Sequence, residues 1–193
     1  MKKILLLFVF CCCSFALQAQ DDELAPPTLD EMADEALKKV RDLGDYIQTI
    51  AGKDISIRDR ERAIDVACAL FADEENNKIQ TKVEIKPKKY KNTLYKIRAY
   101  FKRIYLLQYD KVEIEWYEIG YMDEKLKKGE DGKYYGSITI KQRFKGITKD
   151  KQIHESIVTK VIGVVLEKQI IITETTRVKW IVRLGNITVV ENN

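Results

Sequence analysis

The sequence predicts an α+β fold in which N-terminal helices pack on a strongly curved, mixed or antiparallel sheet. Two patterns indicate this class. Between Lys111 and Val190, apolar and polar residues alternate along long segments separated by short turns, as in antiparallel strands with one buried face. Before Lys111, apolar residues recur at helical spacing in three stretches. The predicted order is helix, helix, strand, helix, and then four or five antiparallel strands.

The first two helices carry start signals. Thr28 and Glu31 have the spacing of a capping box, in which each side chain bonds the backbone amide of the other residue. This helix is expected to end at Ala51-Gly52. Ser56 and Asp59 repeat the capping signal for a second helix, which ends before the polar residues 73–77. Both apolar stripes are interpreted as core surfaces without chemistry.

A strand and a third helix are predicted between these helices and the long strands. Residues 78–87 alternate Ile, Thr and Val with Lys, Gln and Glu, and Pro87 closes the segment. Thr93 is expected to cap a third helix that turns Ile97, Phe101 and Ile104 inward. This interpretation places one short strand ahead of the sheet's long strands.

The long strands are assigned from their alternation and from the turn residues between them. They are Lys111–Tyr121, Tyr134–Phe144, Gln152–Leu166 and Ile170–Leu184. Turns are expected at Gly129–Gly132, from Gly146 to Asp150, and at Glu167-Lys168, with Gly185-Asn186 leading to a last short strand. Strands of about fifteen residues exceed the usual five or six, so the sheet is expected to twist and curl.

The N-terminus predicts export. Lys2 and Lys3, the apolar run from Ile4 to Leu17, and cleavage after Ala19 fit a secretory signal peptide over residues 1–19. Residues 20–27 read as a disordered tether and 28–193 as one domain. A lipoprotein signal using one of the three cysteines at 11–13 is the alternative. After cleavage Cys68 is the only cysteine, so no internal disulfide is expected. We expect a periplasmic or cell-surface protein of a Gram-negative bacterium.

Several short segments resemble the NTF2-like (cystatin-like, SnoaL-like) domains, in particular secreted Bacteroidetes proteins of unassigned activity. They are Ala69–Ala72 before a charged turn, Trp116-Tyr117, and the hairpin sequence Gly132–Gly136. The resemblance covers about residues 28–190 and implies a cone, in which a bent sheet wraps around the helices and a pocket opens at the mouth. Such domains include isomerases, dehydratases and non-catalytic adaptors, so the fold does not choose a function.

The sequence offers little material for catalysis. The mature chain holds one histidine and one cysteine, which leaves no catalytic triad or zinc site to assign. No catalytic residue, metal ligand or cofactor is therefore assigned, and His154 is expected to be exposed. Polar residues on an apolar face are the informative exceptions. On this ground the candidate lining of a ligand pocket is Gln142 and Glu174, with Trp116 and Trp180. The alternatives are that Gln142 and Glu174 lie at a solvated edge of the sheet and that the two tryptophans only pack in the core.

A basic stretch is the other candidate surface. Ten lysines and arginines lie from Lys78 to Arg103 against one acid, Glu84. The candidate contact residues are Lys82, Lys86, Lys88, Lys89 and Lys91. For an exported protein this favours an envelope protein or an acidic glycan over nucleic acid. A solvated face of a strand and helix is the alternative interpretation.

The working hypothesis is an exported, non-catalytic binding or scaffold module of the cell envelope. The alternative is a small-molecule-binding or isomerase/dehydratase-type cone with its pocket near Glu174 and Gln142. No transmembrane segment is expected in the mature chain. We expect a homodimer through the outer face of the sheet, because two aromatic residues and one aliphatic residue lie on this otherwise polar face: Tyr117, Tyr135 and Ile181.

Overall fold

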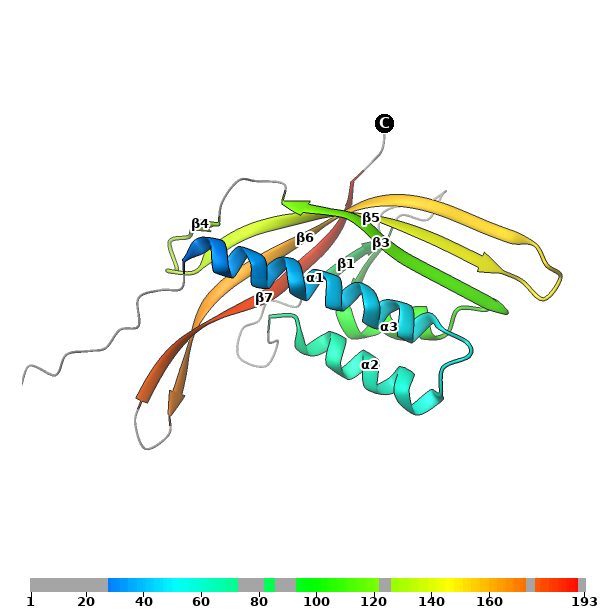
Figure 1. Cartoon of the computed structure of the whole chain (residues 1–193), viewed down its shortest axis with the longest axis horizontal. Coiled ribbons are helices and arrows are strands. Elements are labelled where there is room, and N and C mark those ends of the chain that lie inside the picture. Colours follow the sequence, from blue (N-terminus) through cyan, green and yellow to red (C-terminus); the bar gives the residue numbers. More distant parts are fainter. Residues whose placement is uncertain (1–27, 73–81, 86–92, 122–125, 173–175, 191–193) are drawn as a thin grey trace, which may run out of the picture.

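A computed structural model describes residues 28–72, 82–85, 93–121, 126–172 and 176–190 (Figure 1). For residues 82–85, 93 and 121 it describes the backbone alone. The predicted signal peptide and tether, residues 1–27, lie outside the described residues. The described chain forms three helices and seven strands, in which long strands follow the helices as the sequence predicts.

The three helices are α1 (Leu29–Ala51), α2 (Ile57–Ala69) and α3 (Ile97–Tyr105). The capping box of α1 is confirmed, since the Glu31 amide donates to Thr28 Oγ1 at 3.3 Å and the Thr28 amide donates to Glu31 Oε2 at 3.0 Å. Ser56 caps α2 by accepting from the Asp59 amide at 3.1 Å. These local interactions fix where α1 and α2 begin.

The third helix begins later than the sequence pattern predicts. Thr93–Lys96 form strand β2, and α3 starts only at Ile97, so Thr93 does not cap it. β2 pairs antiparallel with β1 (Lys82–Ile85). Leu94 is exposed on β2, whereas Ile97 and Phe101 are buried on α3. The helical spacing of the apolar residues thus holds from Ile97 onward, and the residues before it form an edge strand.

The sheet has the strand order β2-β1-β7-β6-β5-β3 and is antiparallel except where β1 runs parallel to β7. The remaining strands are β3 (Lys111–Tyr121), β4 (Lys127–Lys128), β5 (Tyr134–Ile147), β6 (Ile153–Ile172) and β7 (Thr176–Val190). β4 pairs only with the start of β5. Three consecutive long strands, β5, β6 and β7, therefore form the body of the sheet.

Two predicted strand ends are wrong. β6 continues through Glu167-Lys168, the expected turn, to Ile172. Glu167 stays in register opposite Ile181, and its carboxylate accepts from Lys133 Nζ at 2.8 Å, so these charges are accommodated within the strand. Gly185-Asn186 does not end β7 either, because the register between β6 and β7 shifts there and the strand runs on to Val190. The charged pair and the glycine mark irregularities within long strands.

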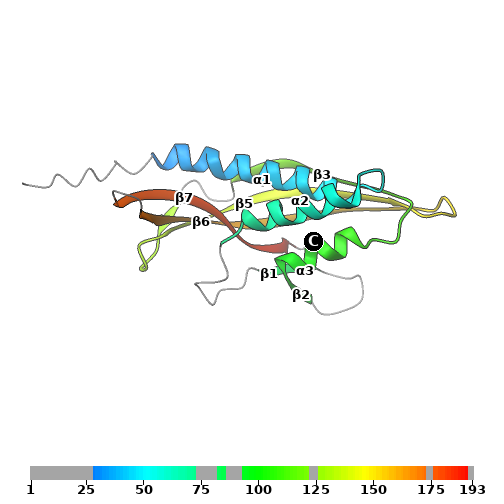
Figure 2. The ribbon, with the colours of Figure 1, turned by 90° about the horizontal axis from the view of Figure 1, so that it is seen from below.

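The core lies on one face of the sheet. Along β6 the buried residues alternate from Lys160 to Leu166, and the same face of β3, β5 and β7 carries Ile114, Ile140 and Leu184. Buried side chains of all three helices join the same cluster, among them Leu43 of α1 and Phe101 of α3. Figure 2 shows the helices gathered along the middle of the strands. One layer of helices thus covers one face of one sheet.

The predicted NTF2-like cone is wrong for this chain. The sheet twists, but it is not strongly curled or closed: β2 and β3 are its two free edges, and no described helix lies on its second face (Figures 1 and 2). That outer face carries ion pairs between neighbouring strands, such as Arg143–Glu115 and Lys145–Glu155. The long strands twist, as expected. The three described helices cover only one face of the sheet, and its two edge strands do not pair with each other, so the sheet stays open.

The edge strand β3 is held by α1. The side chain of Gln48 accepts a hydrogen bond from the backbone amide of Ile114 at 2.7 Å, so this amide points away from β5 toward the helix. A Cβ on Gly44 would lie 3.4 Å from the Cβ of Trp116, which shows how closely α1 passes over the strand. β3 ends beyond an irregularity after Tyr117, where Glu118 has a positive φ of 48°.

The length of β6 predicts an uneven response to truncation within one strand. Ile162→Ala should lower the free energy of unfolding by about 2–4 kcal/mol, because Ile162 is fully buried and its loss leaves a cavity. Ile172→Ala, the matched control, should change it by less than about 0.5 kcal/mol, because Ile172 is 81% exposed. Urea unfolding measures both. Equal losses at the two positions would contradict the placement of the core.

Candidate functional site

A polar cluster lies inside the apolar core. Its members are Trp116 of β3, Gln142 of β5, Lys160 of β6 and Tyr100 of α3. Gln142 Oε1 accepts two hydrogen bonds, from the indole Nε1 of Trp116 at 3.0 Å and from Lys160 Nζ at 2.8 Å. Lys160 Nζ also donates to the Tyr100 hydroxyl at 3.0 Å. Two of the four candidate pocket residues, Trp116 and Gln142, are therefore brought together.

The strand register explains why these side chains meet. Trp116 pairs directly with Gln142 across β3 and β5, so the two side chains leave the sheet on the same face. Lys160 lies opposite Ile140, two residues along β5 from Gln142, and thus on that face as well. α3 then lays the buried Tyr100 over Lys160, with Nζ 5.2 Å from the ring centroid. Three adjacent strands and one helix hold the cluster.

Lys160 is the unusual member. Lys160 is only 4% exposed. Among the described residues, no carboxylate forms an ion pair with its amino group. Buried ammonium groups are costly unless they are paired and hydrogen-bonded. Here two neutral oxygens and an aromatic ring take the place of a counter-ion. Lys160 is therefore a buried hydrogen-bond donor whose partners are neutral oxygens.

A groove adjoins this cluster. It lies between α1 and β3, has a volume of about 700 Å³, and is lined by Trp116, Ile114 and Ile119 together with polar residues of both elements. Those polar residues are Arg41, Asp45, Gln48, Glu113 and Glu115. Trp116 belongs to both places, because its ring lines the groove while its N–H donates to Gln142. The indole is thus the wall between the groove and the buried ammonium group.

The structure does not bring Trp180 to this cluster. Trp180 is paired with Lys168, and Gln142 with Val158, so the two positions are ten residues apart along β6, or about 33 Å. Instead the Trp180 ring packs edge-on against Tyr134 with centroids 5.7 Å apart, and Lys168 Nζ lies 5.1 Å from the ring centroid. Trp180 therefore closes the core at its far end.

The other candidates give less information. Glu174 lies outside the described residues, as do Lys86, Lys88, Lys89 and Lys91 of the basic stretch. Lys82 is in β1, where the backbone alone is described. His154 is exposed, as predicted, with its ring 5.7 Å from that of Tyr109.

Sequence reasoning missed Lys160, although a signal was present. The residue has the parity of Ile162, Val164 and Leu166, which the alternation assigns to the buried face. His154 and Ser156 share this parity, and because lysine is so rarely buried, the polar residues alone predict a solvent-facing side chain at Lys160. Gln142 was found by the parity argument that, applied to Lys160, places both in the core.

Other kinds of site are not seen in the described residues. No group of three or more His, Cys, Asp or Glu side chains lies close enough to hold a metal ion in the parts of the chain that the structure describes. Within those same ranges, none of the helices combines the length and apolar character needed to cross a membrane. No family model, curated protein or solved structure matches the chain. The geometry alone must therefore support any functional proposal.

The cluster predicts opposite effects for its two central residues. Gln142→Leu should lower the free energy of unfolding by about 2–4 kcal/mol, because it leaves the Lys160 ammonium and the Trp116 N–H without their shared acceptor. Lys160→Met should be neutral or stabilising, because it removes a buried charge and keeps an apolar side chain of similar length. Urea unfolding of the single and double variants tests this: Gln142→Leu should cost less in the Lys160→Met background. An unchanged cost would show that the two side chains are not coupled.

Proposed function

We propose that this chain is a non-catalytic binding module that contacts a partner protein through the far end of its longest hairpin. The observation that carries the proposal is a set of apolar side chains left uncovered there. We define the β6–β7 arm as residues 168–172 and 176–180. Ile170, Ile172 and Val178 of the arm are 64%, 81% and 41% exposed, and Ile171 is 38% exposed.

The arm extends the buried face of the sheet beyond the helices. Ile170 pairs with Val178 and Ile172 with Thr176, in the register that places Leu166 opposite Val182 in the core. The exposed residues Ile170 and Ile172 thus continue the same face as the buried Leu166. Trp180 and Lys168 mark the boundary. Figure 1 shows β6 and β7 running past the helices as a two-stranded ribbon. Core-like residues therefore continue where no described helix covers them.

Such a ribbon is well suited to a protein contact. Grouped apolar side chains on a soluble surface typically mark an interaction site, and each one buried there contributes roughly 1.5–3 kcal/mol. The arm also carries the exposed residues Arg177 and Lys179. This charge favours a partner with an apolar centre and an acidic rim. An acidic partner also agrees with the expectation drawn from the basic stretch.

The location of this module is proposed from the sequence. The basic start, apolar run and small-residue end of residues 1–19 support export to the periplasm or cell surface, and they favour a partner from the cell envelope.

Cross-linking tests the arm directly. A photoreactive amino acid at Ile172 should form a covalent adduct with one specific protein in the producing cell, because this side chain is 81% exposed on the proposed contact. The matched control is Ile57, 65% exposed at the start of α2. Adding Ile170→Lys to the Ile172 probe should remove the adduct without changing the unfolding free energy. Adducts of equal yield at positions 57 and 172, or none at 172, would overturn the proposal.

Homodimerisation through the outer face of the sheet remains part of the proposal. Tyr135 is exposed there, whereas Tyr117 and Ile181 are half-buried, and the Arg143 guanidinium lies 5.2 Å from the Tyr117 ring centroid. A dimer mass at micromolar concentration in light scattering is the expected result, and Tyr135→Lys should shift it toward the monomer. A monomeric mass for the unmodified chain would remove this part of the proposal.

A small-molecule role is the second candidate, and the groove between α1 and β3 favours it. Its volume of about 700 Å³ is in the range of ligand pockets, and Trp116 gives it an aromatic wall. A compound that binds the groove should raise the melting temperature of the unmodified chain and of Trp180→Phe. It should not raise that of Trp116→Phe, because Trp116 lines the groove and Trp180 does not. A hit that stabilises both variants equally binds elsewhere and would argue against the groove.

A further inference from the structure

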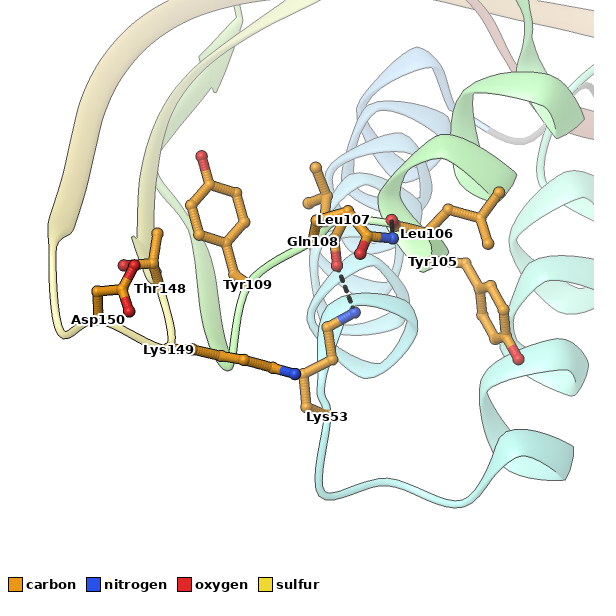
Figure 3. Close-up of a pocket in the computed structure, with 9 residues that line it drawn as sticks. All are labelled: Lys53, Tyr105, Leu106, Leu107, Gln108, Tyr109, Thr148, Lys149 and Asp150. Carbon is orange, nitrogen blue, oxygen red and sulfur yellow. Dashed lines mark hydrogen bonds between the residues drawn. The ribbon is translucent and has the colours of Figure 1, made fainter.

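A second pocket lies at the opposite end of the long strands from the arm (Figure 3). Three segments build it: Lys53 between α1 and α2, Tyr105 at the end of α3 with residues 106–109 that follow it, and residues 148–150 in the turn from β5 to β6. Its volume is about 610 Å³, within the range of small-molecule sites. It shares no lining residue with the α1–β3 groove.

The aromatic walls of this pocket are fixed by packing. The Tyr109 ring lies on Gly146, where an added Cβ would come within 2.7 Å of ring atoms, so only glycine admits the ring there. The same ring packs edge-on against Phe144, with centroids 5.5 Å apart. Tyr105 is held by the buried Arg60, whose guanidinium lies 4.1 Å from the ring centroid and donates to the Tyr105 carbonyl at 2.7 Å. The pocket is therefore preformed.

Two lysines bring positive charge into the pocket. Lys53 Nζ donates to the Leu107 carbonyl at 2.7 Å, and the Lys149 side chain extends from the turn toward Lys53 (Figure 3). Among the described residues neither lysine has an ion-pair partner, and the Asp150 carboxylate lies beside Thr148, away from both. Partial burial of the ammonium group, and secondarily the nearby charge of Arg60, lowers the pKa of Lys53.

We propose that this pocket binds a small organic anion, with a phosphate or carboxylate group held between Lys53 and Lys149 and an apolar body against Tyr109 and Leu107. Ammonium groups bind such oxygens as point charges. The neighbouring rings supply the apolar contact that a free inorganic ion would not use. This site is independent of the arm and of the proposed partner protein.

The first experiment titrates the isotopically labelled full chain with three probes and follows backbone amide NMR signals. Phenyl phosphate carries both the anion and the apolar body, inorganic phosphate only the anion, and phenol only the ring. Phenyl phosphate should give saturable shifts at Lys53, residues 105–109 and residues 148–150, and bind more tightly than either fragment. Added salt should weaken it, because the contact is ionic.

Charge-removing variants make the test specific. Lys149→Gln should weaken phenyl phosphate binding about five-fold or more, because it removes one of two ammonium groups at the site. Lys128→Gln, an exposed lysine of β4 near the other end of β5, is the matched control and should bind as the unmodified chain does. The inference is overturned if no saturable shifts occur at the pocket, if phenol binds as tightly as phenyl phosphate, or if both variants bind equally.

Discussion

The mismatch in length between the long strands and the helices shapes this molecule. β6 has 20 residues and extends about 66 Å, whereas the 23 residues of α1 cover about 35 Å. The helices can therefore bury only the middle of the strand, from Lys160 to Leu166, and both ends run beyond them. One overhang is the apolar β6–β7 arm. The other carries the turn that forms a wall of the pocket around Lys53 and Lys149.

The covered middle of the sheet is not purely apolar. Lys160, Gln142, Trp116 and Tyr100 form a hydrogen-bonded group that no ion pair completes within the described part of the chain. Replacing such groups by apolar side chains of the same size is often neutral or stabilising, so we expect this group to act by favouring one arrangement of the core. In this chain the shared acceptor Gln142 ties three adjacent strands together, and Lys160 joins β6 to α3 through the Tyr100 hydroxyl.

The sequence predicts elements better than their spatial arrangement. The starts of two helices are predicted correctly from Thr28, Glu31 and Ser56, because capping depends only on neighbours along the chain. Curvature is different, since it follows from which strands pair and where the helices lie, and the predicted cone failed on this point. Leu166, Lys168, Ile170 and Ile172 share one parity without interruption, and this pattern indicates one continuous strand in place of the turn expected at Glu167-Lys168. The parity argument that finds Gln142 also applies to Lys160, but the hydrogen bond between these two side chains is visible only once the strands are paired.

The contact between Gln48 and the Ile114 amide bears on self-assembly. A protein that displays isoleucines on a long ribbon is at risk of growing into fibres when its outermost strand also offers free amides to the next molecule. In this chain a side chain from α1 already occupies an amide on the free edge of β3, and the opposite edge, β2, is only 4 residues long. The body of the sheet therefore offers little edge for another chain to pair with. The unpaired edges among the described residues are those of the ribbon itself, because β5 pairs with β6 only up to Leu166 and β1 meets β7 at Ile187.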